Sequence, residues 1–220
     1  MKKATEKLLP DWIDYDTHFK PRYNPFEQRM LADPDSGFFK SLHQPNVKLV
    51  TGEIEKVTEE GVKMNNGETI EADVIVAATG FRIRFGSNIS IRVDGEVMPW
   101  GNRLLWNGSM LNGVPNLMLI IGYANNSWTL SADDTAFILV RLLKSMKSKG
   151  VRSATPRVPS DAPTMKTQLM WPTSATYVQL SEGQLPVYGD RGPWKPRFNL
   201  MTSWFHARWG DITSGLEFSV

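Results

Sequence analysis

The sequence contains no cysteine among its 220 residues. Disulfides, zinc–thiolate sites and cysteine nucleophiles are therefore excluded, and a reducing, cytoplasmic compartment is expected. The sequence also lacks an excess of charge of either sign, because it contains 25 Lys and Arg and 23 Asp and Glu. Without a strong positive charge or a dense basic run, no nucleic-acid partner is expected.

Several other signals are missing. No apolar stretch approaches the ~20 residues that a membrane helix needs, and the start "MKKATEKLLPDW" lacks the apolar region of a secretory signal. His18, His43 and His206 lie far apart without the spacing of metal ligands, so no metal site is expected. The pattern G-x-S-x-G of a nucleophile elbow does not occur.

What is present is the composition of a globular protein, with 41% hydrophobic and 22% charged residues. The N-terminal part reads as a helix ended by Pro10, a long loop over 11–37 and a short helix over 38–44. Turn signals and alternating apolar positions then predict strands, and "NNG" at 65–67 predicts a tight hairpin turn. These strands are expected within 46–52, 53–60, 61–70 and 72–80.

The stretch "DVIVAATGF" (73–81) predicts a strand that is buried on both faces over Val74–Ala77 and stops at a glycine turn. A second strand is expected over Leu117–Ile121, followed by a helix from Trp128 to Lys149. Gly150 is the expected C-cap of this helix.

In that helix Leu139, Leu143 and Met146 recur at helical spacing, which predicts that they face the core. The adjacent Asp133 and Asp134 are attributed to the helix dipole and not to catalysis. Beyond residue 151, proline and tryptophan predict an irregular tail that packs onto the body of the protein.

Three stretches together resemble one family. "ATGF", "HFKPRYNPFEQR" and "GVPNLMLIIGYANNSWTL" are similar, in this order, to flavin-containing and Baeyer–Villiger monooxygenases. The resemblance covers most of 11–150 and, more loosely, the tail through 197–211. It implies an α/β fold of the two-dinucleotide-binding-domain type, FAD/NAD(P)-binding and Rossmann-like, with a β-meander and a C-terminal irregular or helical tail.

The resemblance implies an enzyme that uses FAD and NADPH. Such an enzyme inserts one oxygen atom of O2 into a ketone or a soft heteroatom through a C4a-peroxyflavin. The small-molecule substrate itself is not determined. The family's glycine-rich phosphate loops are missing here, because no G-x-G occurs among the 17 glycines.

The missing loops indicate a C-terminal portion of such an enzyme, whose N-terminal half or partner chain carries them. The expected parts are 1–45 as the end of the NADPH-binding domain and return loop, 46–150 as the C-terminal part of the FAD-binding domain, and 151–220 as the tail. Two alternatives stay open: a non-catalytic remnant or subunit that needs a partner chain, and a binding domain of unrelated fold.

The resemblance implies that Arg29 is the catalytic residue, since an arginine after a Pro-aromatic pair lies over the flavin in the family. A guanidinium stays charged and presents planar donors, which suits the stabilisation of negative charge. An ordinary solvated arginine is the alternative, and Arg22 is a weaker candidate in the same loop.

Two stretches are expected to bind the cofactor. A strand that ends in Thr-Gly lets the backbone approach a ligand closely, which points to Thr79, Gly80 and Phe81. The start of the long helix offers N–H groups and a partial positive charge to the flavin. Its candidate residues are Asn125, Asn126, Ser127, Trp128, Thr129 and Leu130, for which ordinary helix capping is the alternative.

Overall fold

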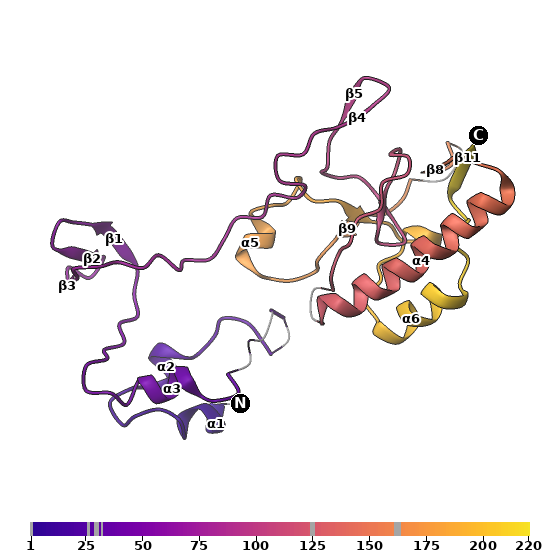
Figure 1. Ribbon diagram of the computed structural model, residues 1–220. Helices are drawn as coiled ribbons and strands as arrows, with labels where there is room; N and C mark the ends of the chain where they lie inside the picture. Colours follow the sequence, from indigo (N-terminus) through magenta and orange to yellow (C-terminus); the bar gives the residue numbers. More distant parts are fainter. Residues whose placement is uncertain (1, 26, 29–30, 32, 124–125, 161–163) are drawn as a thin grey trace. The chain divides into compact units, whose positions relative to one another are not determined.

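The computed structural model describes residues 2–25, 27–28, 31, 33–123, 126–160 and 164–220 (Figure 1). The fold is mixed α/β with small sheets. The helices are α1 (Lys2–Glu6), α2 (Tyr15–His18), α3 (Gly37–Ser41), α4 (Trp128–Lys149), α5 (Thr176–Gln179), the 3-10 helix η1 (Gly192–Trp194) and α6 (Leu200–Trp209). The strands are β1 (Ile54–Val57), β2 (Gly61–Met64), β3 (Thr69–Glu71), β4 (Ile91–Val93), β5 (Glu96–Met98), β6 (Leu105–Trp106), β7 (Met110–Leu111), β8 (Ser153–Pro156), β9 (Gln168–Leu169), β10 (Val187–Tyr188) and β11 (Leu216–Ser219).

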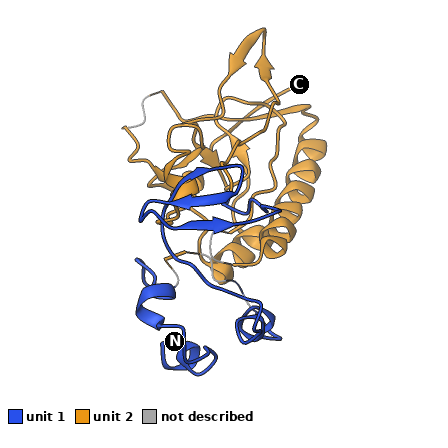
Figure 2. Ribbon diagram, turned by 90° about the vertical axis from the view of Figure 1, so that its left-hand side faces the viewer, with its two compact units in different colours: residues 1–25, 30–80 blue, residues 26–29, 81–220 orange. Residues whose placement is uncertain are grey.

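The chain divides into two compact units (Figure 2). Unit 1 comprises residues 1–25 and 30–80, and unit 2 comprises residues 26–29 and 81–220. The division between Gly80 and Phe81 falls inside the expected part 46–150. The three-part division by domain stays a prediction, because it concerns the domains of a longer enzyme.

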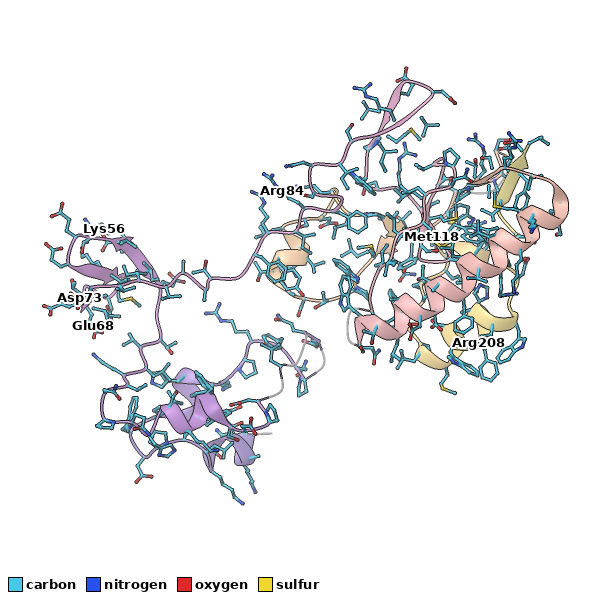
Figure 3. The ribbon with its side chains drawn as sticks, in the orientation of Figure 1. Lys56, Glu68, Asp73, Arg84, Met118 and Arg208 are labelled. Carbon is cyan, nitrogen blue, oxygen red and sulfur yellow. The ribbon has the colours of Figure 1, made fainter. Side chains whose placement is uncertain are left out.

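The β-meander of unit 1 confirms the predicted hairpin. β2 pairs antiparallel with β1 on one side and with β3 on the other. In the turn at 65–67, the N–H of Gly67 donates to the carbonyl of Met64 at 2.9 Å, and Gly67 has a φ of 87°. Only glycine reaches that φ without strain, which is why "NNG" marks the turn. Lys56 and Glu68 lie on this meander (Figure 3).

The N-terminal expectations are met in part. Helices form near both predicted places, but α1 ends at Glu6, before Pro10, and α3 ends at Ser41, short of residue 44. A further single turn, α2, interrupts the expected loop 11–37. The carboxylate of Asp14 caps α2 by accepting the N–H of Thr17 at 2.7 Å. The segment 46–52 is not a strand.

The prediction of a doubly buried strand over Val74–Ala77 is wrong for this chain. No described residue pairs with this segment, and Val74 and Val76 are 78% and 84% exposed. An apolar run predicts burial but does not supply the neighbouring strands whose N–H and C=O groups a buried strand requires. The four residues therefore form extended backbone with an apolar surface.

Unit 2 is built around two groups of buried side chains. One includes Leu105, Leu111 and Val178, and the other includes Trp106, Ile138 and Ala207. Four antiparallel pairs surround them: β4 with β5, β6 with β7, β8 with β11 and β9 with β10. Leu105 and Trp106, which are adjacent in β6, thus belong to different groups. Both groups also contain residues of the tail, so they join the tail to the rest of unit 2.

The expected strand over Leu117–Ile121 is also wrong. The segment makes a single bridge, between Met118 and Met110, and Ile120 is 67% exposed. Ile121 is nevertheless buried. With no parallel neighbour among the described residues, the apolar run again lacks the ladder that would make it a strand.

The bounds of α4 are those predicted, and Gly150 ends the helix with a φ of 66°. The predicted core face is wrong apart from Met146. The helix buries Ser131, Asp134, Thr135, Ile138, Leu142 and Met146, whereas Leu139 and Leu143 are exposed. Because α4 carries apolar residues on two faces, periodicity alone could not decide which one packs inward. No helix among the described residues is long and apolar enough to cross a membrane.

The tail packs onto unit 2 less completely than predicted. Trp194 is buried and Trp171 is half-buried, but Trp204 and Trp209 are exposed on α6. Their rings contact each other and Phe205, with the centroids of Trp204 and Trp209 5.3 Å apart. The tail tryptophans therefore divide between core packing and surface contacts.

Arg141 of α4 joins this helix to the end of α6. Its guanidinium donates to the carbonyls of His206 at 3.2 Å, Ala207 at 3.0 Å and Gly210 at 2.7 Å. The last carbonyls of a helix lack partners within the helix, and a cation there also complements its dipole. Arg141 therefore fixes the C-terminal end of α6 against α4.

We expect Arg141→Ala to lower the free energy of unfolding by about 2–3 kcal/mol, because carbonyls at the end of α6 lose a charged donor. Chemical denaturation followed by tryptophan fluorescence measures this change. Lys144→Ala, an exposed position on the same helix, is the matched control and should change stability by less than about 0.5 kcal/mol. Equal stability of the two variants would refute the role assigned to Arg141.

Candidate functional site

An aromatic cavity of about 440 Å3 lies within unit 2. Its volume is within the range of small-molecule sites, which are concave and mostly apolar. Three separate stretches of the chain supply its walls. The lining residues are Phe81, Arg82, Ile83, Arg84, Tyr123, Trp128, Trp171, Thr173, Tyr177 and Val178.

The first wall is the extended segment 81–84, which runs beside α5 (Figure 1). The hydroxyl of Ser181, just after α5, donates to the carbonyls of Ile83 at 3.4 Å and Tyr177 at 2.8 Å. The rings of Phe81 and Tyr177 pack with their centroids 4.7 Å apart. The aromatic end of "ATGF" is therefore held at the cavity by the tail.

The second wall depends on a close approach at Gly122. The rings of Trp128 and Trp171 lie with centroids 6.0 Å apart, and the indole N–H of Trp171 donates to the carbonyl of Gly122 at 3.3 Å. A Cβ at Gly122 would come within 2.0 Å of the Trp128 ring. Only glycine therefore permits this position of Trp128.

We expect Gly122→Ala to displace Trp128 from the cavity wall and to destabilise the chain by about 1–3 kcal/mol, as overpacking does. Chemical denaturation gives the stability, and the fluorescence of the native state reports the altered Trp128 environment. Gly37→Ala is the control, since its Cβ would meet only Asp33 at 3.9 Å. An unchanged stability and emission spectrum in Gly122→Ala would contradict the close approach.

The third wall, Tyr123, is held by a buried ion-pair network. Its hydroxyl donates to Asp134 Oδ2 at 3.2 Å. Arg208 Nη1 donates to Asp134 Oδ1 at 3.0 Å, and Arg197 Nη2 lies 3.7 Å from Asp134 Oδ2. The Asp134 side chain is only 5% exposed, so its charge requires these partners.

Burial raises the pKa of the Tyr123 phenol, and the charge of Asp134 acts in the same direction. The Tyr123 phenol therefore keeps its proton and stays neutral, and it donates this proton in the hydrogen bond to Asp134. Arg208, labelled on α6 in Figure 3, also stacks on aromatic rings, 4.1 Å from the ring centre of Phe137 and 4.3 Å from that of Trp204. The network therefore links α4, α6 and the cavity wall.

The attribution of Asp134 to the helix dipole is corrected by this geometry. The first turn of α4 contains no acidic residue, and Asp134 points to two arginines instead. A sequence signal did exist: Asp134 lies on one helical face with Ser131, Ile138 and Leu142. A buried carboxylate at such a position predicts a cationic partner, although not which arginine supplies it.

The predicted site residues fall into three groups. Arg29 and Asn125 lie outside the described residues. Phe81 and Trp128 both line the cavity, so the fold brings these two predicted residues together. The others are exposed and do not line it: Thr79, Gly80, Asn126, Ser127, Thr129 and Leu130.

Ser127 is the N-cap of α4, but its side chain makes no cap hydrogen bond. Its hydroxyl instead shares a hydrogen bond of 2.7 Å with that of Thr129. Gly80 has a φ of 93°, and a Cβ there would meet no atom within 4 Å. The positive φ therefore favours glycine at position 80, whereas the surrounding space would admit a side chain. The assignment of these residues to FAD stays a prediction.

Sequence comparisons give the family. A protein of Acinetobacter baylyi named "Probable FAD-binding monooxygenase AlmA" is 34% identical over 199 residues, which are 90% of this chain and 40% of that protein. "FAD-containing monooxygenase EthA" of Mycolicibacterium smegmatis is 33% identical over 88% of this chain and 39% of its own length. "Putative FAD-containing monooxygenase MymA" of Mycobacterium tuberculosis is 35% identical over 81% of this chain and 36% of its own length. No family model matches the chain, and no solved structure matches it significantly.

The chain belongs to the family of FAD-containing monooxygenases, which confirms the resemblance drawn from its three motifs. It spans about 40% of the length of the relatives in Acinetobacter baylyi and Mycolicibacterium smegmatis. Their length therefore includes residues with no counterpart in this sequence.

The residues present fit one part of FAD and not the other. Aromatic walls that include Trp128 and Trp171 can hold a flat ring. In dinucleotide-binding folds the pyrophosphate lies at a glycine-rich turn before a helix, and the sequence contains no G-x-G for such a turn. The sequence therefore does not contain this type of phosphate site.

Proposed function

We propose that this chain is part of an FAD-dependent, NADPH-using monooxygenase that inserts one oxygen atom of O2 into a ketone or a soft heteroatom. The observation that carries the proposal is the aromatic cavity to which "ATGF" contributes Phe81 and the start of α4 contributes Trp128, in a chain similar to FAD-containing monooxygenases over about nine-tenths of its length. The two-dinucleotide-binding, Rossmann-like fold belongs to the same proposal.

In this proposal, bound FAD supplies the redox chemistry, as cofactors do for reactions with O2. The chain's own residues bind and orient the substrate. Phe81, Trp128 and Trp171 surround its apolar part and exclude water, while neutral Tyr123 offers an oxygen that is fixed by Asp134. Arg29 is proposed to stabilise negative charge that develops beside the flavin.

The test is a chimera in which this chain replaces the matching segment of the Acinetobacter baylyi relative. The expected result is a yellow protein that oxidises NADPH and transfers 18O from 18O2 to a ketone or a thioether, detected by mass spectrometry. The intact relative, measured alongside, is the control. A chimera that retains FAD and consumes NADPH but releases all oxygen as hydrogen peroxide would contradict the monooxygenase proposal.

The lack of a phosphate cradle supports a second candidate, a non-catalytic subunit that requires a partner chain. The two candidates differ in a simple measurement. In the first, the chimera turns over substrate with the residues of this chain at the cavity. In the second, the chimera retains FAD yet shows no oxygenation, and the chain acts by binding its partner. The 18O yield therefore separates them.

A further inference from the structure

We propose that the aromatic cavity binds flat aromatic compounds that carry a carboxylate, so that the substrates are anionic. The inference rests on the proposed function, because it names the substrate class of that site. It follows from the rings that line the cavity and from two arginines at the same walls.

The rings provide flat apolar surfaces. Phe81 and Tyr177 form one pair, with centroids 4.7 Å apart, and Trp128 and Trp171 form the other, 6.0 Å apart. Tyr123 adds a fifth ring. Aromatic faces favour flat ligands through offset and edge contacts beyond the burial of apolar area. The walls therefore select a ring system over a flexible polar molecule.

The charge comes from Arg82 and Arg84, which line the same cavity from the segment 81–84. Arg84 is labelled in Figure 3. Both are exposed, and neither makes a side-chain hydrogen bond or ion pair with a described residue. In contrast, Arg141 and Arg208 donate to carbonyls or to Asp134. Arg82 and Arg84 are therefore available to a ligand.

No acidic residue balances these two cations among the described residues of the cavity wall. A guanidinium presents planar donors that match a carboxylate in pairs, and it stays charged at any physiological pH. An uncharged ligand would form no ion pair with Arg82 or Arg84. A carboxylate on the ring system matches both features of the cavity at once.

The occupant is a substrate and not a cofactor phosphate, because the cavity walls are dominated by rings and lack a glycine-rich backbone turn. The phosphates of dinucleotide cofactors are held largely by backbone N–H groups at glycine turns, although a guanidinium binds phosphate as well as carboxylate. Competition with FMN separates the two sources of negative charge, a carboxylate and a phosphate.

The test is isothermal titration calorimetry of the 220-residue chain with 2-naphthoate and with the neutral 2-naphthalenemethanol, which has the same rings. We expect 2-naphthoate to bind about five- to tenfold more tightly, and added salt to remove most of this difference. The double variant Arg82→Ala, Arg84→Ala should bind both ligands equally. Arg152→Ala, an exposed arginine outside the cavity, is the matched control and should keep the preference.

A second variant locates the binding. Phe81 is 68% exposed, so Phe81→Ala should fold, and it should weaken both naphthalene ligands by the same factor. Four results would overturn the proposal: no binding of either ligand, equal affinity in the unaltered chain, a preference that survives the double variant, or tighter competitive binding of FMN with the same dependence on the arginines. The measurement requires no flavin turnover, so its failure leaves the monooxygenase proposal standing, and the 18O test can fail while carboxylate binding stands.

Discussion

Asp134→Ala is expected to lower the free energy of unfolding by about 3–5 kcal/mol, the usual cost of removing one partner from a buried ion pair. The side chains of Arg197 and Arg208 are only 10% and 19% exposed, so water cannot fully replace the carboxylate. Tyr123 would lose its acceptor in addition. Chemical denaturation followed by tryptophan fluorescence measures the loss.

The neighbouring Asp133 gives a matched control, because it is exposed on the same helix. Asp133→Ala should change stability by less than about 0.5 kcal/mol. Asp134→Asn, which retains an acceptor but not the charge, should fall between the two. If Asp134→Ala proved as stable as Asp133→Ala, the network would not be a source of stability and the position of Tyr123 would need another explanation.

Local signals explain why the bounds of α4 could be predicted. Its C-terminal end depends on Gly150, whose φ of 66° few other residues adopt, and its basic last turn agrees with the helix dipole. The hairpin at 65–67 is local in the same sense. Such features require only a few consecutive residues, and a single sequence contains them in full.

The buried face of α4 could not be predicted because it depends on which segment packs against it. Leu143 and Val140 are as apolar as Leu142 but are exposed, whereas α6 and the tail cover Ile138 and Leu142. The same holds for Val74–Ala77. A run of apolar residues favours burial, but whether the run is buried depends on the segments that pack against it in the tertiary structure.

The cavity combines residues that the motifs indicate with residues that no motif indicates. The motifs indicate Phe81 and Trp128 as site residues, but they do not indicate Tyr123, Trp171 or Tyr177. The tail supplies two of these rings from positions about 90 residues beyond Phe81. No local spacing connects segments so distant, so only the packing of the tail could reveal that they share one wall.

Arg29 stays a prediction from the family resemblance, and its test has the largest expected effect on activity. In a chimera of full length, Arg29→Ala should retain FAD and its reduction by NADPH. The rate of 18O transfer to product should fall about a hundred- to a thousandfold. Losing one preorganised charged donor typically costs about 2.7–4 kcal/mol in the transition state. Bound flavin is read from its absorbance, and product from mass spectrometry.

Two further variants make this test specific. Arg29→Lys should restore activity only in part, because an ammonium keeps the charge but loses the planar pair of donors. Arg22→Ala, at an exposed position of the same N-terminal loop, should leave turnover nearly unchanged, since a solvated ion pair contributes at most about 1 kcal/mol. Normal product yield in Arg29→Ala together with a large loss in Arg22→Ala would transfer the catalytic role to Arg22. Normal yield in both variants would remove this loop from the chemistry and leave the cavity of unit 2 as the candidate site.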